Sequence, residues 1–177
     1  MNSQWYSFFS WFIYGSGGKR GVSRVVQGWI VLEVYLGIVI SLFLNSSPST
    51  VSEKVSIPLS IFLMTIVISL VGAVQNVLVS KEIFRLSEFK DGGVADYVFP
   101  FHLSILGISI TFVYWLVSFL KFFDGLKFSF RFFDFHAGTM FGILLLLISL
   151  RLSWGCLQGT FWMYFSMHQI RMMDNEE

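Results

Sequence analysis

The sequence predicts an all-α fold: a polytopic membrane protein built as a four-transmembrane-helix bundle with an interfacial N-terminal helix. Hydrophobic residues make up 55% of the 177 residues and charged residues only 13%, against about 25% charged in an average soluble protein. Such a chain has too few polar side chains to cover a water-facing surface, and its length suits one domain. Four stretches are also long and apolar enough to form spans of about 20 residues.

The N-terminal segment, residues 1–18, is expected to lie at the membrane surface. Trp5, Phe8, Phe9 and Phe12 recur at helical spacing in a stretch that is too short to span the bilayer. A Gly/Ser linker follows. Packing of these rings against the bundle is an equal alternative. The segment lacks the basic region and cleavage site of a signal peptide, so we expect the chain to insert through its own spans.

The transmembrane domain is expected to cover residues 19–168 and to have short connections. Its spans are predicted at residues 25–44, 57–79, 98–120 and 137–158, the last with a helical extension to His168. Residues 45–56 are rich in Ser, Pro and Asn and predict a surface loop. Residues 81–97 form a longer, charged connection. Residues 121–136 interleave seven Phe with Lys, Arg and Asp, which suits a hairpin or an amphipathic segment at headgroup depth.

Basic residues in the short connections favour two cytoplasmic termini. With the N-terminus inside, the cytoplasmic set is Lys19, Arg20, Arg24, Lys81, Arg85, Lys90 and Arg171, and the outer set is Lys54, Lys121, Lys127 and Arg131. We therefore expect a multi-pass protein of a bacterial inner (plasma) membrane. Residues 169–177 would form a cytoplasmic acidic tail.

Two charged residues lie inside predicted spans. Glu33 follows Arg24 by nine residues, which places it about 13 Å into the membrane at 1.5 Å per residue. Arg151 lies at a similar depth in the same leaflet. An unpaired charge there costs at least about 2.5 kcal/mol, so the two residues are predicted to form an intramembrane ion pair. The pair either fastens the first span to the fourth, within or between chains, or lines a water-filled path.

Small and polar residues recur at helical spacing on every span. The stripes are Glu33, Gly37 and Ser41; Thr65, Ser69, Gly72 and Asn76; Ser104, Gly107, Thr111 and Ser118; and the pairs Gly138 with Gly142 and Gly155 with Gly159. Small residues let helices approach closely in lipid, so these positions are predicted to pack helices together. Because the last two glycine pairs point to different faces, one could pack within the chain and the other against a second copy. Packing inside one chain would need the same stripes.

Recognised catalytic signatures are absent from the sequence, which has no GxSxG, HExxH, cysteine-pair or phosphate-loop motif. We therefore expect no enzyme, no cofactor and no metal site. His102, His136 and His168 do not form a pair at matched depth within the bundle, as a bis-histidine haem would need. A net charge of +1 gives no basis for direct nucleic-acid binding.

The order and length of the four spans, with the charged connection over residues 81–97, resemble the membrane subunit of the Kiwa anti-phage defence system. They are also similar to phage-exclusion membrane proteins and to multi-spanning accessory proteins of RNA-targeting CRISPR loci. The Kiwa resemblance implies a homo-oligomeric membrane sensor with a soluble cytoplasmic effector as partner. This likeness is one of architecture, and architecture alone does not establish function.

The expected function is therefore a non-enzymatic sensor or scaffold, a homo-oligomer such as a tetramer, that couples envelope perturbation to a cytoplasmic effector in anti-phage defence. The predicted sensing loop contains Phe128, Phe130, Arg131, Phe132 and Phe133, and the predicted partner-binding residues are Lys81, Arg85, Glu88, Lys90 and Asp91. Two other functions stay open. One is an ion-conducting pore that uses the Glu33 and Arg151 faces, and the other is a structural subunit of a larger membrane complex.

Overall fold

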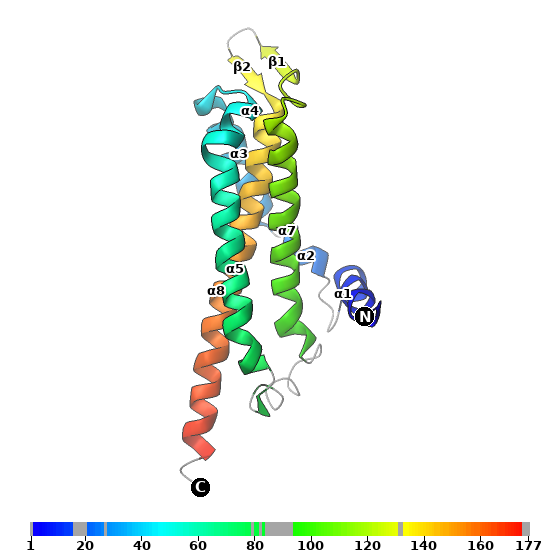
Figure 1. Cartoon of the computed structure of the whole chain (residues 1–177), viewed down its shortest axis with the longest axis vertical. Coiled ribbons are helices and arrows are strands. Elements are labelled where there is room, and N and C mark those ends of the chain that lie inside the picture. The colour runs from blue at the N-terminus through cyan, green and yellow to red at the C-terminus, as the bar shows by residue number, and fades with distance from the viewer. Residues whose placement is uncertain are drawn as a thin grey trace.

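The protein is described here by a computed structural model, which covers residues 2–15, 21–26, 28–78, 80–81, 83, 94–130 and 133–174. Within these residues the fold is predominantly helical, and the long helices run side by side along one axis (Figure 1). A small hairpin caps one end of this bundle, and the C-terminus lies at the other end.

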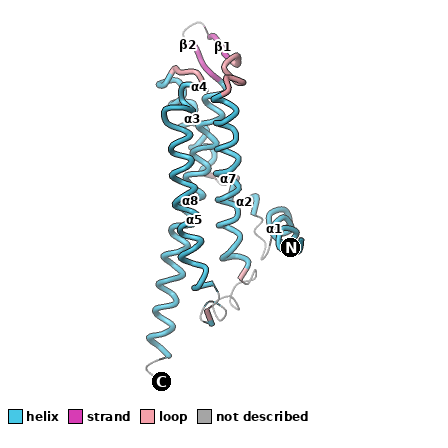
Figure 2. Tube along the Cα trace, in the orientation of Figure 1, coloured by secondary structure: helices cyan, strands magenta, loops and turns pink. Residues whose placement is uncertain are grey.

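The elements follow one another as α1 (Asn2–Tyr14), α2 (Gly21–Val25), α3 (Trp29–Leu44), α4 (Pro48–Val51), the π-helical turn η1 (Ser52–Ser56), α5 (Ile57–Leu78), α7 (Ala95–Phe119), β1 (Lys127–Phe130), β2 (Phe133–His136) and α8 (Ala137–Asp174). The elements α4, η1 and α5 adjoin without a break, so they form one helical rod. Figure 2 shows the strands at the same end of the bundle as α4.

Three helical segments are long and apolar enough to cross a membrane: Pro48–Gln75, Tyr97–Phe119 and Ala137–Met173. They agree with the second, third and fourth predicted spans. The first predicted span is different, because its helix α3 has only 16 residues and begins at Trp29 rather than at Val25. At 1.5 Å per residue α3 is about 24 Å long, which is shorter than the hydrocarbon core of about 30 Å.

The surface of α3 is apolar and its packed face is polar or small. Its buried residues are Glu33, Gly37 and Ser41, the stripe expected from the sequence. Outward-facing Val31 and Phe43 are 72% and 88% exposed. A helix on the surface of a soluble protein shows the opposite arrangement, with its apolar stripe inside. This reversal and the three long apolar helices indicate a membrane protein.

Helix α8 is the centre of the bundle, because α3, α5 and α7 all pack against it. It begins at Ala137, directly after the last residue of β2, and runs for 38 residues. That corresponds to about 57 Å, so its C-terminal part extends beyond the other helices (Figure 1). One continuous helix thus connects the hairpin to the opposite end of the molecule.

The surface loop predicted over residues 45–56 is wrong, because helix begins there at Pro48. Ser47 has the extended backbone of a helix N-cap and Pro48 occupies the first turn, where its missing N–H is no loss. Asp124 reaches this helix start from the loop before β1. Its carboxylate accepts hydrogen bonds from the Ser49 N–H at 3.1 Å and from the Ser49 hydroxyl at 2.7 Å.

The Phe-rich connection forms an antiparallel hairpin, one of the two forms that its spacing suited. The register pairs Lys127 with His136 and Phe130 with Phe133. These two short strands are an exception to the all-α prediction. The alternation of ring-bearing and polar residues along them is the period of two that favours a strand.

The aromatic N-terminal helix α1 packs on the bundle beside α7. Phe8 and Trp11 are 1% and 4% exposed and cluster with Leu103, and the Phe8 ring lies 5.6 Å from that of Phe99. Phe8 and Trp11 therefore pack against the bundle, which is the alternative given above to a helix at the membrane surface. The side chain of Trp5 lies outside the described set. Phe9, on the same helix, is 50% exposed and free to contact lipid.

Candidate functional site

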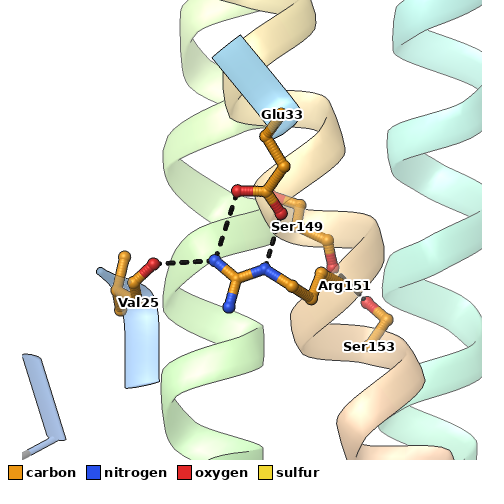
Figure 3. Close-up of polar contacts among 5 residues, drawn as sticks. All are labelled: Val25, Glu33, Ser149, Arg151 and Ser153. Atoms are coloured by element: carbon orange, nitrogen blue, oxygen red, sulfur yellow. Dashed lines mark hydrogen bonds and ion pairs between the residues drawn. The ribbon is translucent and has the colours of Figure 1, made fainter. Parts of the chain in front are cut away.

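The structure brings Glu33 and Arg151 together as an ion pair within one chain (Figure 3). The Arg151 Nε donates a hydrogen bond to Glu33 Oε1 at 2.5 Å, and Nη2 donates to Oε2 at 3.3 Å. The Arg151 side chain is 20% exposed and the Glu33 side chain is 8% exposed. Two parallel hydrogen bonds between a guanidinium and a carboxylate give both orientation and energy. The pair therefore fastens the first part of α3 to the middle of α8.

Arg151 also stabilises an interruption of the helix between α2 and α3, which was not predicted from the sequence. Helix α2 ends at Val25 and α3 begins at Trp29. In an uninterrupted helix the Val25 carbonyl would accept from the Trp29 N–H. Here it accepts a 2.7 Å hydrogen bond from Arg151 Nη2 instead. Broken helices are tolerated at membrane depth where a neighbouring helix satisfies the freed backbone groups. Gly28, inside the predicted span, was the one signal of this break.

A row of hydroxyl groups joins α7 to α8 at the level of the ion pair, on another face of α8. The Thr111 hydroxyl lies 2.7 Å from that of Ser149 and donates to the Leu145 carbonyl at 3.2 Å. Ser104 and Ser153 face each other at 3.4 Å. Figure 3 shows Ser149 and Ser153 two residues before and two residues after Arg151 on α8, about one turn apart from each other. Interhelical hydrogen bonds of this kind hold helices together in lipid.

Two of the predicted packing glycines are essential to close approach in this chain. A Cβ added at Gly142 would lie 2.5 Å from Trp115 Cζ2, and one at Gly138 would lie 2.9 Å from Pro48 Cγ. Gly107 and Gly37 are less tight: their Cβ atoms would lie 3.0 Å from Leu152 and 3.7 Å from the Met140 carbonyl oxygen. Gly138 and Gly142 therefore set the distances among α4, α7 and α8.

The other predicted packing glycines face open space. A Cβ added at Gly72, Gly155 or Gly159 would have no heavy atom within 4 Å. The predicted stripe on α5 does not face the bundle, since Thr65 and Ser69 are also exposed, and the side chain of Asn76 lies outside the described set. The face that packs is the apolar one: Leu63 and Val67 cluster with Ile108, and Val74 and Val77 with Phe101. Intrachain packing on this helix uses shape and apolar area rather than small residues.

An open groove of about 790 Å³ lies on the α1 side of the ion pair. Its walls come from the start of α3, the start of α7 and α8 from Arg151 to Met163. Pro100 and Phe101 form part of the α7 wall, and Gly155 and Gly159 part of the α8 wall. Cys156 also lines the groove. Its side chain is largely buried, and its thiol lies 3.5 Å from the Pro100 carbonyl oxygen. The sequence offered no pattern from which this groove could be predicted.

The predicted loop residues are only partly within the described residues. Phe128, Phe130 and Phe133 belong to the strands of the hairpin, but their side chains are outside the described set, as are Arg131 and Phe132 altogether. Lys81 is exposed after the end of α5. Arg85, Glu88, Lys90 and Asp91 lie outside the described residues.

The three histidines lie apart. His102, on α7, lies tilted against the Phe8 ring and edge-to-face with the Phe99 ring. His136 is buried at the end of β2, and His168 is exposed on the C-terminal part of α8. Over the described residues, no group of three or more His, Cys, Asp or Glu side chains is placed to hold a metal ion.

Comparison with known proteins yields no relative. A scan against protein-family models finds no match, and searches of the curated proteins and of the solved structures find none either.

Proposed function

We propose that the protein is a non-enzymatic membrane sensor or scaffold in which α8 carries a change at the hairpin end to a cytoplasmic partner at the other end. One observation supports this proposal above the rest. Helix α8 starts immediately after β2, contacts each of the other long helices and continues past them to Asp174.

The hairpin end of α8 is tied to its neighbours by hydrogen bonds. Thr139 donates to the Ser46 carbonyl at 2.9 Å, and the Tyr114 hydroxyl donates to the Gly138 carbonyl at 2.6 Å. A displacement of the hairpin would therefore move α8 together with the ends of α3 and α7. Because packed interfaces respond by switching between discrete arrangements, such a displacement could reach the far end of α8.

In this proposal α3 also crosses the membrane, as the first of four spans, and α1 lies in the interface on the cytoplasmic side. The outward rings of α1, with Phe9 half exposed, suit a helix buried about 5–10 Å into the headgroup and acyl boundary. Both termini would be cytoplasmic in a bacterial inner membrane. The resemblance to the Kiwa membrane subunit makes anti-phage defence the biological setting that we propose.

The test uses two spin labels in proteoliposomes. In a Cys156→Ser background, labels at Lys81→Cys and His168→Cys report the distance between the end of α5 and the C-terminal part of α8. Lysophospholipid added to the hairpin side disturbs the packing of one leaflet. We expect the distance to shift in the intact protein and to stay constant when residues 128–133 are deleted.

The same preparations distinguish the sensor from a pore. A distance that never responds, or that responds equally without the hairpin, would contradict signal transfer through α8. Ion flux across the liposome membrane that changes on Glu33→Gln would instead establish a pore. The complex is also purified in mild detergent from its own cells. Its mass tests whether the protein is a homo-oligomer, and a soluble protein that co-purifies at fixed stoichiometry would be the cytoplasmic partner.

A further inference from the structure

The groove lies against α8 beyond the N-terminal end of α3, where α3 would cover α8 if it were longer. On the hairpin side of the ion pair, α3 covers α8 so closely that a Cβ at Gly37 would lie 3.7–3.9 Å from the backbone at Met140 and Leu144. On the other side, Gly155 and Gly159 have nothing within 4 Å of that position. The groove thus continues the α3–α8 interface past Trp29, the first residue of α3.

The length of the groove matches one leaflet of a bilayer. Its α8 wall runs from Arg151 to Met163, which is about 18 Å at 1.5 Å per residue. Half of a hydrocarbon core is about 15 Å. Since α8 lies along the bundle axis (Figure 1), the groove runs in the direction of the lipid chains.

The chemistry of the wall is that of an acyl-chain site. Phe101, Leu103, Leu152 and Met163 line it, and about 790 Å³ is within the usual range for ligand sites. Trp29, Trp154 and Trp162, which also line it, are 61%, 59% and 69% exposed, so the groove opens sideways to lipid. At its deep end the Arg151 guanidinium is held by Glu33 and by the Val25 carbonyl.

The lining of the groove argues for lipid as the occupant. Water is a poor occupant, because it would have to contact a predominantly apolar wall. Lipid is the solvent around this surface, and an acyl chain is narrow enough to enter the groove.

We propose that this groove binds an acyl chain of a phospholipid from the leaflet on the α1 side. The chain lies along Gly155 and Gly159 with its methyl end toward the Glu33–Arg151 pair. Its headgroup lies near Trp162, at the depth where aromatic residues collect at membrane interfaces. This site needs only that the groove face the bilayer, so it stands apart from the sensing function proposed above.

The experiment is photo-crosslinking of the full chain in vesicles of phosphatidylethanolamine and phosphatidylglycerol. A fraction of the phospholipid carries a diazirine at the end of one acyl chain, and adducts are mapped by mass spectrometry. We expect adducts to concentrate on Leu103 and Leu152 over the outward-facing Ile68 and Leu116. In Gly159→Trp the new ring would fill the groove, and most of the groove adducts should be lost.

A matched control is Gly72→Trp, which places the same ring at another glycine that faces open space but lies away from the groove. It should leave the adduct pattern unchanged, and both variants should elute and melt like the parent protein. Equal labelling of groove and outer positions, or groove labelling that survives Gly159→Trp, would overturn the proposal. Efficient Gly155→Cys disulfide formation between copies in a Cys156→Ser background would overturn it too, by showing a second protein copy there.

Discussion

At the scale of single residues, Arg151 has two tasks that a different side chain could not combine. Its guanidinium neutralises the Glu33 carboxylate and also donates to the carbonyl left free at the end of α2. Lysine carries the same charge but not the planar fork that reaches two acceptors at once. Charge, hydrogen bonding and the break in the chain are therefore coupled through one residue.

Arg151→Met should be strongly destabilising, because it leaves a buried carboxylate and a backbone carbonyl without their donor. Breaking a buried pair by removing one partner costs about 3–5 kcal/mol. Glu33→Gln should cost less, since an amide oxygen still accepts from Arg151. The double variant Glu33→Leu/Arg151→Met should recover part of the loss but not all of it, because the Val25 carbonyl stays unsatisfied. Unfolding titrations with dodecyl sulfate in mixed micelles measure these differences.

If Arg151→Met and the double variant lose equal stability, the carboxylate is not the source of the penalty. If none of the variants changes the free energy of unfolding, the pair does not hold α3 to α8.

At the scale of helices, the two glycine pairs of α8 have different roles. Gly142→Ala places a methyl group 2.5–2.6 Å from the rings of Trp115 and Tyr114, and the Trp115 side chain is fully buried. Overpacking of this kind costs about 1–3 kcal/mol. Gly155→Ala meets no atom within 4 Å and should be neutral, or stabilising by about 0.5–1 kcal/mol through helix propensity. The same unfolding titration compares them, and equal effects would refute the assignment of faces.

The start of the α4–α5 rod depends on a residue far away in the sequence. Asp124→Ala removes both hydrogen bonds to Ser49 and the negative charge at a helix N-terminus. We expect a loss of about 1–2 kcal/mol, the size of a lost N-cap, with earlier fraying of this end in hydrogen exchange. The nearby exposed Glu53 is the matched control, and its replacement by Ala should stay within about 0.5 kcal/mol. Protection of residues 48–51 that is equal in the two variants would argue against this cap.

At the scale of the whole molecule, the small residues of α5 that face outward are available to a second copy. A Cβ added at Gly72 meets no heavy atom within 4 Å in this chain, and Gly72 is exposed, so Gly72→Leu should preserve the fold of the protomer. If copies associate through the stripe of Thr65, Ser69 and Gly72, the added bulk should separate them, whereas Gly72→Ala should leave them together. Light scattering or native mass spectrometry in mild detergent measures the mass. An oligomer that is unchanged in Gly72→Leu would place the contact on another surface.

Local hydropathy and helix geometry predicted some features of this protein, whereas features that depend on tertiary contacts were not predicted. The positions of three long helices followed from local hydropathy, and the Glu33–Arg151 contact followed from depth arithmetic along two helices. The stripe on α5 was predicted to pack helices together, within one chain or between copies, and the structure turns it away from the bundle. The sequence did not predict the helix over residues 48–56, because the hydrogen bonds at its start require the fold to bring Asp124 beside Ser49. The break before Trp29 was missed, because Gly28 alone does not end a helix.

The sequence by itself determined that this protein belongs in a membrane, which stretches are long and apolar enough for spans, and which two charges need one another. Each of these depends on the free energy of moving residues from water to lipid, a property that can be summed along the chain. Only the tertiary structure decided which face of α5 packs, where the helix of the first predicted span is interrupted and where the groove lies. In lipid an apolar face has no need to be buried, so the shape of neighbouring helices makes that choice.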